Sequence, residues 1–217
     1  TCDLSPALLA EYNIDLARLT TIKNGEAFID GETITPADIF DHVANGGDLC
    51  STTAINIGEY EELFQKYASE YDAVIHINIG SGFSSCYQNA CLAAEDFPNV
   101  RVIDSQNLTT GQGLLVLEAC RLAKVCDDLD EIVEKLNAFA TRIESSFLLD
   151  QLAYMAKGGR CSSVAALGAN LLGLKPCIEV KNGKLTVVKK YRGTYAKCLA
   201  SYVKDRLADR EDILRNE

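Results

Sequence analysis

One short segment constrains the fold of this chain more than any other: an apolar run followed by a glycine-serine turn. Residues 72–90 read DAVIHINIGSGFSSCYQNA. The run at 74–79 is rich in Ile and Val and too short for a helix, so we expect a buried strand there. A Gly-Ser-Gly turn follows at 80–82, and the serines at 84–85 lie at the expected N-cap of a helix over residues 86–94.

A strand, a tight turn and a helix start gather polar groups around one point. The free N–H groups of the first helical turn and the positive end of the helix dipole favour an anion. The hydroxyls of Ser81, Ser84 and Ser85 can hold a carboxylate or a phosphate. An ordinary turn capped by serines would carry the same residues, so this segment alone leaves both interpretations open.

Strand-like and helix-like segments alternate along residues 1–150, which we expect to form one domain. The expected helices cover 6–12, 36–43, 57–69, 86–94, 111–121 and 129–143, and the expected strands cover 16–22, 74–79 and 101–104, with an Asn-Gly turn at 23–26. This order predicts an α/β fold with a mostly parallel sheet flanked by helices. The hydroxyl-bearing loops 52–53, 80–85 and 105–113 are then expected at the carboxyl ends of strands, where such sheets bind ligands.

The chain changes character near residue 150. We expect a second, α+β domain over 151–217, with a helix of small residues at 163–172. A hairpin of strands 177–180 and 185–189 should turn at Asn182-Gly183, and a helix over 195–208 should follow. One helix and one hairpin give a thin core, so we expect this second domain to be incomplete at its C-terminus.

Charge is unevenly distributed along the chain. The formal net charge is −10, which argues against nonspecific nucleic-acid binding. Residues 157–197 nevertheless hold nine cations and one anion, a formal charge of +8, whereas residues 1–156 carry −17. Either these are two differently solvated surfaces, or the basic stretch docks an acidic partner or a phosphate-bearing ligand.

Cysteine usage and hydropathy indicate a cytoplasmic globular protein. The nine cysteines include no C-x-x-C pair and most lie among apolar neighbours, so we expect reduced core residues and no metal site. No apolar run reaches the roughly 18–20 residues of a transmembrane span, and no secretory signal opens the sequence. His76, in the middle of a strand, is expected to be a satisfied core residue.

Two enzyme interpretations compete at the glycine-serine turn. Gly80-Ser81-Gly82 followed by Asp104, 22 residues past Gly82, partly matches a dinucleotide-binding motif, but Ser85 replaces its third glycine. The turn around Ser84 also partly matches a hydrolase nucleophile elbow, but that elbow needs a histidine after the serine and none follows His76. A nucleotide-dependent enzyme or an atypical serine hydrolase is therefore the alternative to non-catalytic carboxylate binding.

Several spread segments together resemble the DegV family of bacterial fatty-acid-binding proteins. They occur in the family's order along nearly the whole chain, which makes the combination specific although each piece alone is weak. The matching segments are 1–5 (TCDLS), 52–60 (TTAINIGEY), 81–87 (SGFSSCY), 104–113 (DSQNLTTGQG), 157–160 (KGGR) and 175–176 (KP).

The resemblance implies a non-catalytic protein that holds one long-chain fatty acid between two domains, without a cofactor. It also implies presentation of the carboxylate to a separate fatty acid kinase, which forms an acyl phosphate for phospholipid synthesis. Thr52 and Ser84 match the family's carboxylate-binding residues. The implied supporting residues are Thr53, Ser81, Gly82, Ser85 and Arg160.

The sequence also departs from the family pattern. The strand that usually precedes the segment matched by residues 1–5 is absent. The family usually continues beyond the position of Leu214 with a portion of the second domain that carries a histidine near the head group. We therefore expect a chain that lacks both of these segments.

Overall fold

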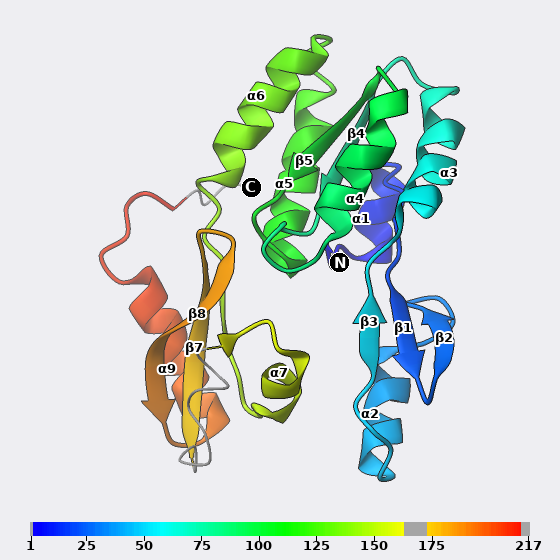
Figure 1. Cartoon of the computed structure of the whole chain (residues 1–217). Helices are drawn as coiled ribbons and strands as arrows, with labels where there is room; N and C mark the ends of the chain where they lie inside the picture. The colour runs from blue at the N-terminus through cyan, green and yellow to red at the C-terminus, as the bar shows by residue number, and fades with distance from the viewer. Residues whose placement is uncertain (1, 163–172, 214–217) are drawn as a thin grey trace. The chain divides into compact units, whose positions relative to one another are not determined.

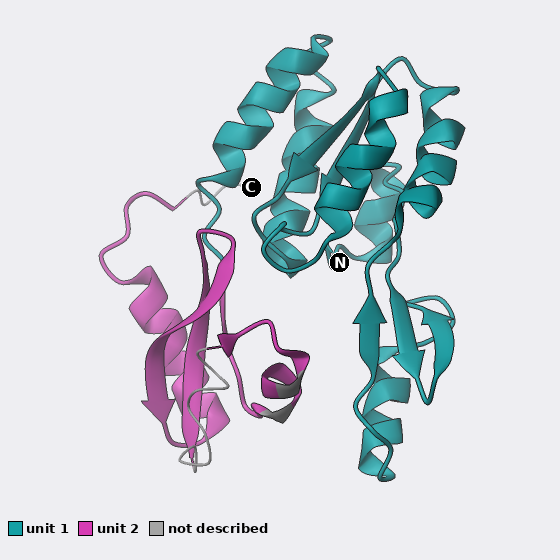
Figure 2. Cartoon of the chain, viewed as in Figure 1, with its two compact units in different colours: residues 1–145 teal, residues 146–217 magenta. Residues whose placement is uncertain are grey.

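The computed structural model describes residues 2–162 and 173–213 of the chain (Figure 1). These residues divide into two compact units, 1–145 and 146–217, which are coloured separately in Figure 2. Each unit has its own sheets and its own core, and each is described by itself below.

Unit 1 contains two small sheets and six α-helices among its described residues. Its elements are α1 (Pro6–Glu11), β1 (Thr20–Lys23), β2 (Glu26–Ile29), α2 (Pro36–Ala44), β3 (Ser51–Thr53), α3 (Ile57–Ala68), β4 (Val74–Asn78), α4 (Cys86–Ala93), the 3-10 helix η1 (Ala94–Asp96), β5 (Val100–Asp104), α5 (Thr109–Leu122) and α6 (Leu129–Ala140).

The β4–β5 pair is parallel, in a register that runs from Val74 opposite Val100 to Asn78 opposite Asp104. Alternate side chains point to opposite faces of the pair. On one face, Val74 packs with the apolar residues of α3 and α4, and on the other face Ile75 packs with those of α5 and α6. Both faces are therefore covered by helices, as a parallel βαβ unit requires.

The second sheet of unit 1 corrects the expectation of a mostly parallel sheet. Its order is β2-β1-β3, and β1 pairs antiparallel with both neighbours. An Asn-Gly turn joins β1 to β2, with Asn24 and Gly25 at positive φ of 53° and 82°, as a tight hairpin demands. Parallel pairing needs a long crossover, and among the described strands only β4 and β5 are joined by a helical crossover into a parallel pair.

The strand predicted over 16–22 was misplaced. The structure forms β1 at Thr20–Lys23 and leaves residues 16–19 outside any strand. The reason is pairing: β3 meets only Thr20–Ile22, and β2 extends the ladder to Lys23. A strand exists only where a neighbour accepts and donates its backbone hydrogen bonds.

Unit 2 is built on the antiparallel sheet β6-β7-β8. Its elements are β6 (Ser146–Leu148), α7 (Ala153–Gly158), β7 (Leu174–Lys181), β8 (Lys184–Arg192) and α9 (Tyr195–Leu207). Asn182 and Gly183, both at positive φ, form the predicted turn between β7 and β8. The predicted helix at 163–172 lies outside the described residues.

A groove borders the unpaired edge of β4, which pairs only with β5 among the described residues. Two adjoining cavities, of about 260 and about 690 Å³, share residues 13–17, Ile75 and His76 in their linings. Tyr60 and Asn78 border the smaller cavity. Buried polar groups of unit 1 therefore line open space beside this strand.

Five of the cysteines are buried, as expected of core residues, and four are half-buried. All nine cysteines lie in the described ranges, and none forms a disulfide. Residues 2–162 and 173–213 contain no cluster of three or more His, Cys, Asp or Glu side chains arranged to hold a metal ion. No helix within these ranges combines the length and apolar character needed to cross a bilayer.

Candidate functional site: the serine turn

The predicted glycine-serine turn forms at the carboxyl end of β4. The Gly80 N–H donates to the Asn107 carbonyl at 2.8 Å, and the Phe83 N–H closes the turn onto the Gly80 carbonyl at 2.9 Å. A Cβ atom at Gly80 would lie 2.9 Å from the Asn107 nitrogen, so a side chain has no room here. The turn is thus held against the loop that follows β5.

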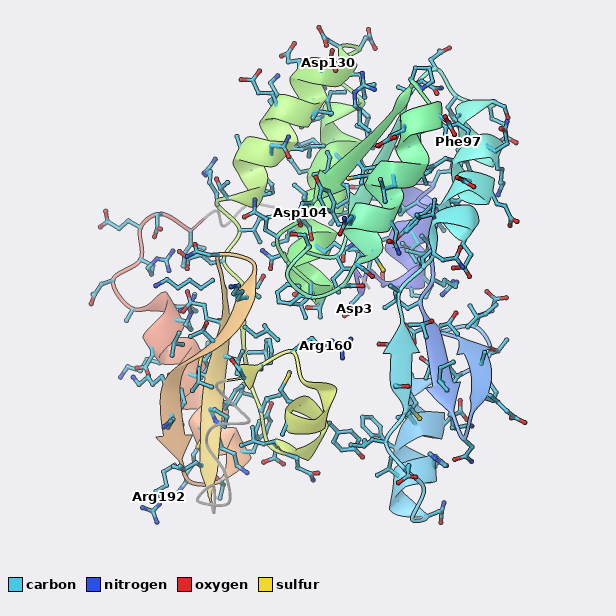
Figure 3. All side chains as sticks on the ribbon, in the orientation of Figure 1. Asp3, Phe97, Asp104, Asp130, Arg160 and Arg192 are labelled. Atoms are coloured by element: carbon cyan, nitrogen blue, oxygen red, sulfur yellow. The ribbon has the colours of Figure 1, made fainter. Side chains whose placement is uncertain are left out.

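Asp104, the last residue of β5, binds the turn directly. The Ser81 N–H donates to Asp104 Oδ1 at 3.0 Å, and the Ser81 hydroxyl donates to Asp104 Oδ2 at 2.6 Å. The Gln106 N–H donates to Asp104 Oδ1 at 2.9 Å. Figure 3 labels Asp104 where β5 ends.

Ser84 is the serine that caps α4, although it lies one residue before the N-cap position and two residues before the first residue of the helix. Its Oγ accepts the Cys86 N–H at 3.2 Å and lies 3.1 Å from Cys86 Sγ, to which its proton is directed. Ser85 occupies the N-cap position, but its backbone is already helical and its side chain makes no capping bond. Both serines therefore lie at the start of α4, as expected, but only the Ser84 side chain accepts a hydrogen bond from the helix.

Thr52 and Thr53 lie outside the sheet that carries the serine turn. They belong to β3, whose partner is β1, and both are exposed. The expectation that loop 52–53 follows a strand of the same parallel sheet was therefore wrong. The Asn89 side chain on α4 connects the two regions, because its Nδ2 donates to the Ile55 carbonyl at 2.7 Å.

Arg160 lies in unit 2, and Figure 3 labels it there. Its side chain is exposed, and Nη1 donates to the Gly158 carbonyl at 2.7 Å. Ser81, Gly82, Ser84 and Ser85 share one turn of unit 1.

The sequence interpretation gave no part in the head-group site to two residues that organise this region, Asn89 and Asp104. Asp104 carried a signal, because it ends a strand 22 residues after Gly82, but that signal favoured a ribose-binding acid. In the structure both of its oxygens accept hydrogen bonds from the chain itself. No pattern in the sequence identified Asn89, since its partner is a backbone carbonyl 34 residues away.

A buried polar cluster lies on β4, next to the turn. The Tyr60 hydroxyl donates to Asn78 Oδ1 at 3.1 Å, and His76 makes edge contacts with the rings of Tyr60 and Phe64. His76 Nε2 and Asn78 Nδ2 are buried without a hydrogen-bond partner among the described residues. The expectation that His76 is satisfied was therefore wrong, although its position in the core was correct.

The hydrolase alternative finds no support in this geometry. His76 faces the aromatic core of α3, and its buried Nε2 has no partner. Burial lowers the pKa of His76 from its ordinary value of 6.5 to about 4. Among the described residues, neither histidine hydrogen-bonds a serine, so no nucleophile and base are paired.

Comparisons with known proteins agree with the sequence segments and with this fold. The family model described as uncharacterised protein, DegV family COG1307, matches residues 1–212. A DegV domain-containing protein of Clostridium acetobutylicum is 31% identical over 216 residues, which cover 98% of this chain and 77% of that protein. A second such protein, from Clostridium perfringens, is 32% identical over 196 residues, covering 89% of this chain and 70% of the relative.

Solved structures of fatty-acid-binding proteins share the fold. A fatty-acid-binding DegV family protein from Thermus thermophilus matches with a TM-score of 0.82 and 27% identity over 94% of this chain and 74% of its own. One from Streptococcus agalactiae matches with a TM-score of 0.81 and 29% identity over 96% and 76%. A stearic-acid-binding protein from Eubacterium ventriosum matches with a TM-score of 0.81 and 26% identity over 94% and 74%. On this agreement of sequence and fold, the chain belongs to the DegV family.

Proposed function

We propose that this chain binds a long-chain fatty acid, holds its carboxylate with Ser84 and Thr52, and presents it to a separate kinase that forms an acyl phosphate. The geometry of Ser84 carries the proposal. Its hydroxyl proton is directed at a sulfur atom, which is a weak acceptor, at the start of α4. The fatty acids bound by the related DegV structures support the choice of ligand.

A carboxylate is a stronger acceptor than the thiol it would replace. Ser84 Oγ already accepts the Cys86 N–H, which fixes the oxygen while leaving the proton free to turn. A charge-assisted O–H···O⁻ bond is roughly twice as strong as a neutral one. The positive end of the α4 dipole adds to the attraction. Thr52 offers a second hydroxyl, which is exposed and has no hydrogen-bond partner among the described residues.

Binding of the acyl chain needs no catalytic group. Each buried methylene contributes about 0.8 kcal/mol, so an acyl chain supplies enough energy for tight binding. The proposal assigns the phosphoryl transfer to the partner, and this chain then acts as the binding subunit without a cofactor of its own.

Loss of either proposed donor should weaken fatty-acid binding. Ser84→Ala and Thr52→Val are each expected to raise the Kd for a C18 fatty acid about tenfold, because a charged acceptor loses one donor. Neither variant should change the Kd for the matching C18 alcohol by more than about twofold. Isothermal titration calorimetry with both ligands provides the measurement.

Ser69→Ala is the matched control for this experiment. Ser69 lies at the end of α3, and its hydroxyl donates to the Lys66 carbonyl at 2.9 Å, away from the serine turn. It should retain the wild-type Kd for both ligands. Wild-type affinity for the fatty acid in Ser84→Ala and Thr52→Val would contradict the proposed site.

A second prediction concerns the kinase. Lys190 and Arg192 are exposed on β8 and form no ion pair among the described residues, whereas Lys189 pairs with Asp205 at 2.6 Å. We expect Lys190→Glu with Arg192→Glu to lower acyl phosphate formation by the partner kinase at least about fivefold, with fatty-acid affinity unchanged. Lys189 stays in place because its loss would break a contact inside unit 2.

The same change in net charge can be made at the other end of the hairpin. Lys181 and Lys184 flank the turn between β7 and β8, and their reversal to glutamate should leave acyl phosphate formation near the wild-type rate. Equal loss in both double variants would indicate a response to overall charge rather than docking at Lys190 and Arg192.

A further inference from the structure

The contacts of Asp104 go beyond those that pair β4 with β5. The strands are already joined by their ladder, and the Ser105 N–H donates to the Asn78 carbonyl at 3.3 Å beyond it. The Asp104 side chain instead reaches Ser81, the third residue after the end of β4, through two hydrogen bonds. Its effect is therefore on the conformation of the turn.

The Ser81 hydroxyl uses its only proton in the hydrogen bond to Asp104. An ionised carboxylate can only accept hydrogen bonds, so Ser81 must donate across the 2.6 Å contact to Oδ2. The two backbone bonds from Ser81 and Gln106 occupy Oδ1. Ser81 therefore has no proton to offer a ligand, whereas the proton of Ser84 meets only a sulfur atom.

The Asp104 carboxylate also places a negative charge beside one side of the turn. A ligand carboxylate is repelled from that side and attracted to the start of α4. The two serines are therefore held differently: the Ser81 hydroxyl donates to the Asp104 carboxylate, whereas the Ser84 hydroxyl donates only to a sulfur atom, which is a weak acceptor.

We propose that Asp104 is a positioning residue of the head-group site: it holds Ser81 so that the turn directs the Ser84 hydroxyl, rather than Ser81, to the ligand carboxylate. This inference rests on the proposed function for its ligand. Its structural part, the fixation of the turn by Asp104, applies to the protein without ligand.

Two substitutions at Asp104 test the proposal. Asp104→Ala removes every acceptor, so the Ser81 and Gln106 amides should exchange with solvent at least about tenfold faster in the ligand-free protein. The Kd for a C18 fatty acid should rise about tenfold, while the Kd for the C18 alcohol stays within about twofold. Asp104→Asn keeps an oxygen for the two N–H donors and should restore slow exchange and most of the fatty-acid affinity.

The double variant with Ser81→Ala separates positioning from other effects. If Asp104 acts through Ser81, then Asp104→Ala with Ser81→Ala should bind the fatty acid no more weakly than Asp104→Ala alone. Asp130→Ala is the matched control, because it removes a carboxylate of α6 that pairs with Arg101 and lies in the same unit. It should leave the fatty-acid Kd and the exchange of the Ser81 amide unchanged.

The outcomes that overturn each claim differ. If the Ser81 and Gln106 amides of Asp104→Ala exchange faster but the ratio of fatty-acid to alcohol affinity is unchanged, Asp104 is not a positioning residue. If these amides exchange at the wild-type rate, Asp104 does not fix the turn. If the wild-type protein binds the fatty acid and the alcohol with equal affinity, the proposed carboxylate site is wrong. Amide exchange in the ligand-free protein would still show whether Asp104 fixes the turn. If Asp104→Ala does not fold, Ser81→Ala removes the 2.6 Å bond alone and should raise the fatty-acid Kd about threefold.

Discussion

Replacing Gly80 by alanine is expected to lower the free energy of unfolding by about 3 kcal/mol and to weaken fatty-acid binding at least tenfold. The added Cβ atom would lie 2.9 Å from the Asn107 nitrogen and 3.0 Å from the Gln106 carbonyl carbon. Both contacts are with backbone, which cannot rotate away as a flexible side chain would. The turn must move, and the hydrogen bond between Gly80 and Asn107 is lost with it.

The displacement matters for binding because Gly80 is the first residue of the serine turn. A shift of the turn away from Asn107 also moves Ser84, and a small misplacement of a donor weakens a charge-assisted hydrogen bond. Urea unfolding followed by circular dichroism gives the stability, and calorimetry with a C18 fatty acid gives the affinity.

Gly58→Ala provides the matched control. A Cβ atom at Gly58 would lie 3.4 Å from Asn56 Oδ1, which is ordinary contact, and Gly58 is in the first turn of α3. Alanine is favoured over glycine in a helix by about 1 kcal/mol, so this variant should be at least as stable as the wild type. A Gly80→Ala protein with wild-type stability and affinity would show that the turn tolerates a side chain.

The second large effect is expected at acidic pH. Burial lowers the pKa of His76 from 6.5 to about 4 in the folded protein. Between these values the unfolded chain binds a proton that the folded chain does not. The contribution of His76 to stability is therefore complete above pH 6.5 and is lost progressively as the pH falls toward 4, by about 3 kcal/mol in total.

The surroundings of His76 explain the direction. The rings of Tyr60 and Phe64 contact its imidazole from α3, and Asn78 is its polar neighbour on β4. Burial also raises the pKa of the Tyr60 phenol, which stays neutral. Asp15 borders the same cavities as His76, but no ion pair between the two is present among the described residues. A protonated imidazole here would lose its hydration without a counter-ion in contact.

His76→Phe isolates this contribution. Phenylalanine keeps an aromatic ring in the core and cannot take up a proton, so the free energy of unfolding should depend less steeply on pH between 4 and 6.5 than in the wild type. Carboxylates titrate in both proteins and cancel in the comparison. Parallel slopes for His76→Phe and wild type would contradict the assignment.

Much of the local structure was predictable from the sequence. The run at 74–79, the turn at 80–82 and the helix after Ser85 appear as β4, a tight turn and α4. The Asn24-Gly25 and Asn182-Gly183 pairs form hairpin turns with both residues at positive φ. These features depend on residues close together in the chain, whose backbone preferences and capping bonds act without help from distant segments.

The pairing of strands was not predictable in the same way. Residues 16–19 have strand-like composition but lie in no strand, and β3 joins an antiparallel sheet although it precedes a βαβ unit. A strand with suitable residues can pair with several others, and the packing of the whole unit decides among them. Three loops were expected to meet at one edge of the sheet. Only two of them do, the serine turn and the loop after β5.

The sequence by itself determined the family, the position of the serine turn and the residue types proposed to bind a carboxylate. Only the tertiary structure decided what each hydroxyl does: the Ser81 hydroxyl donates to Asp104, while Ser84 Oγ accepts the Cys86 N–H and its own proton meets only a sulfur atom. It also decided that His76 Nε2 is buried without a partner. The physical reason is range: backbone preferences act over a few residues, whereas a hydrogen bond between Ser81 and Asp104 spans 23 residues and exists only once β4 and β5 have paired.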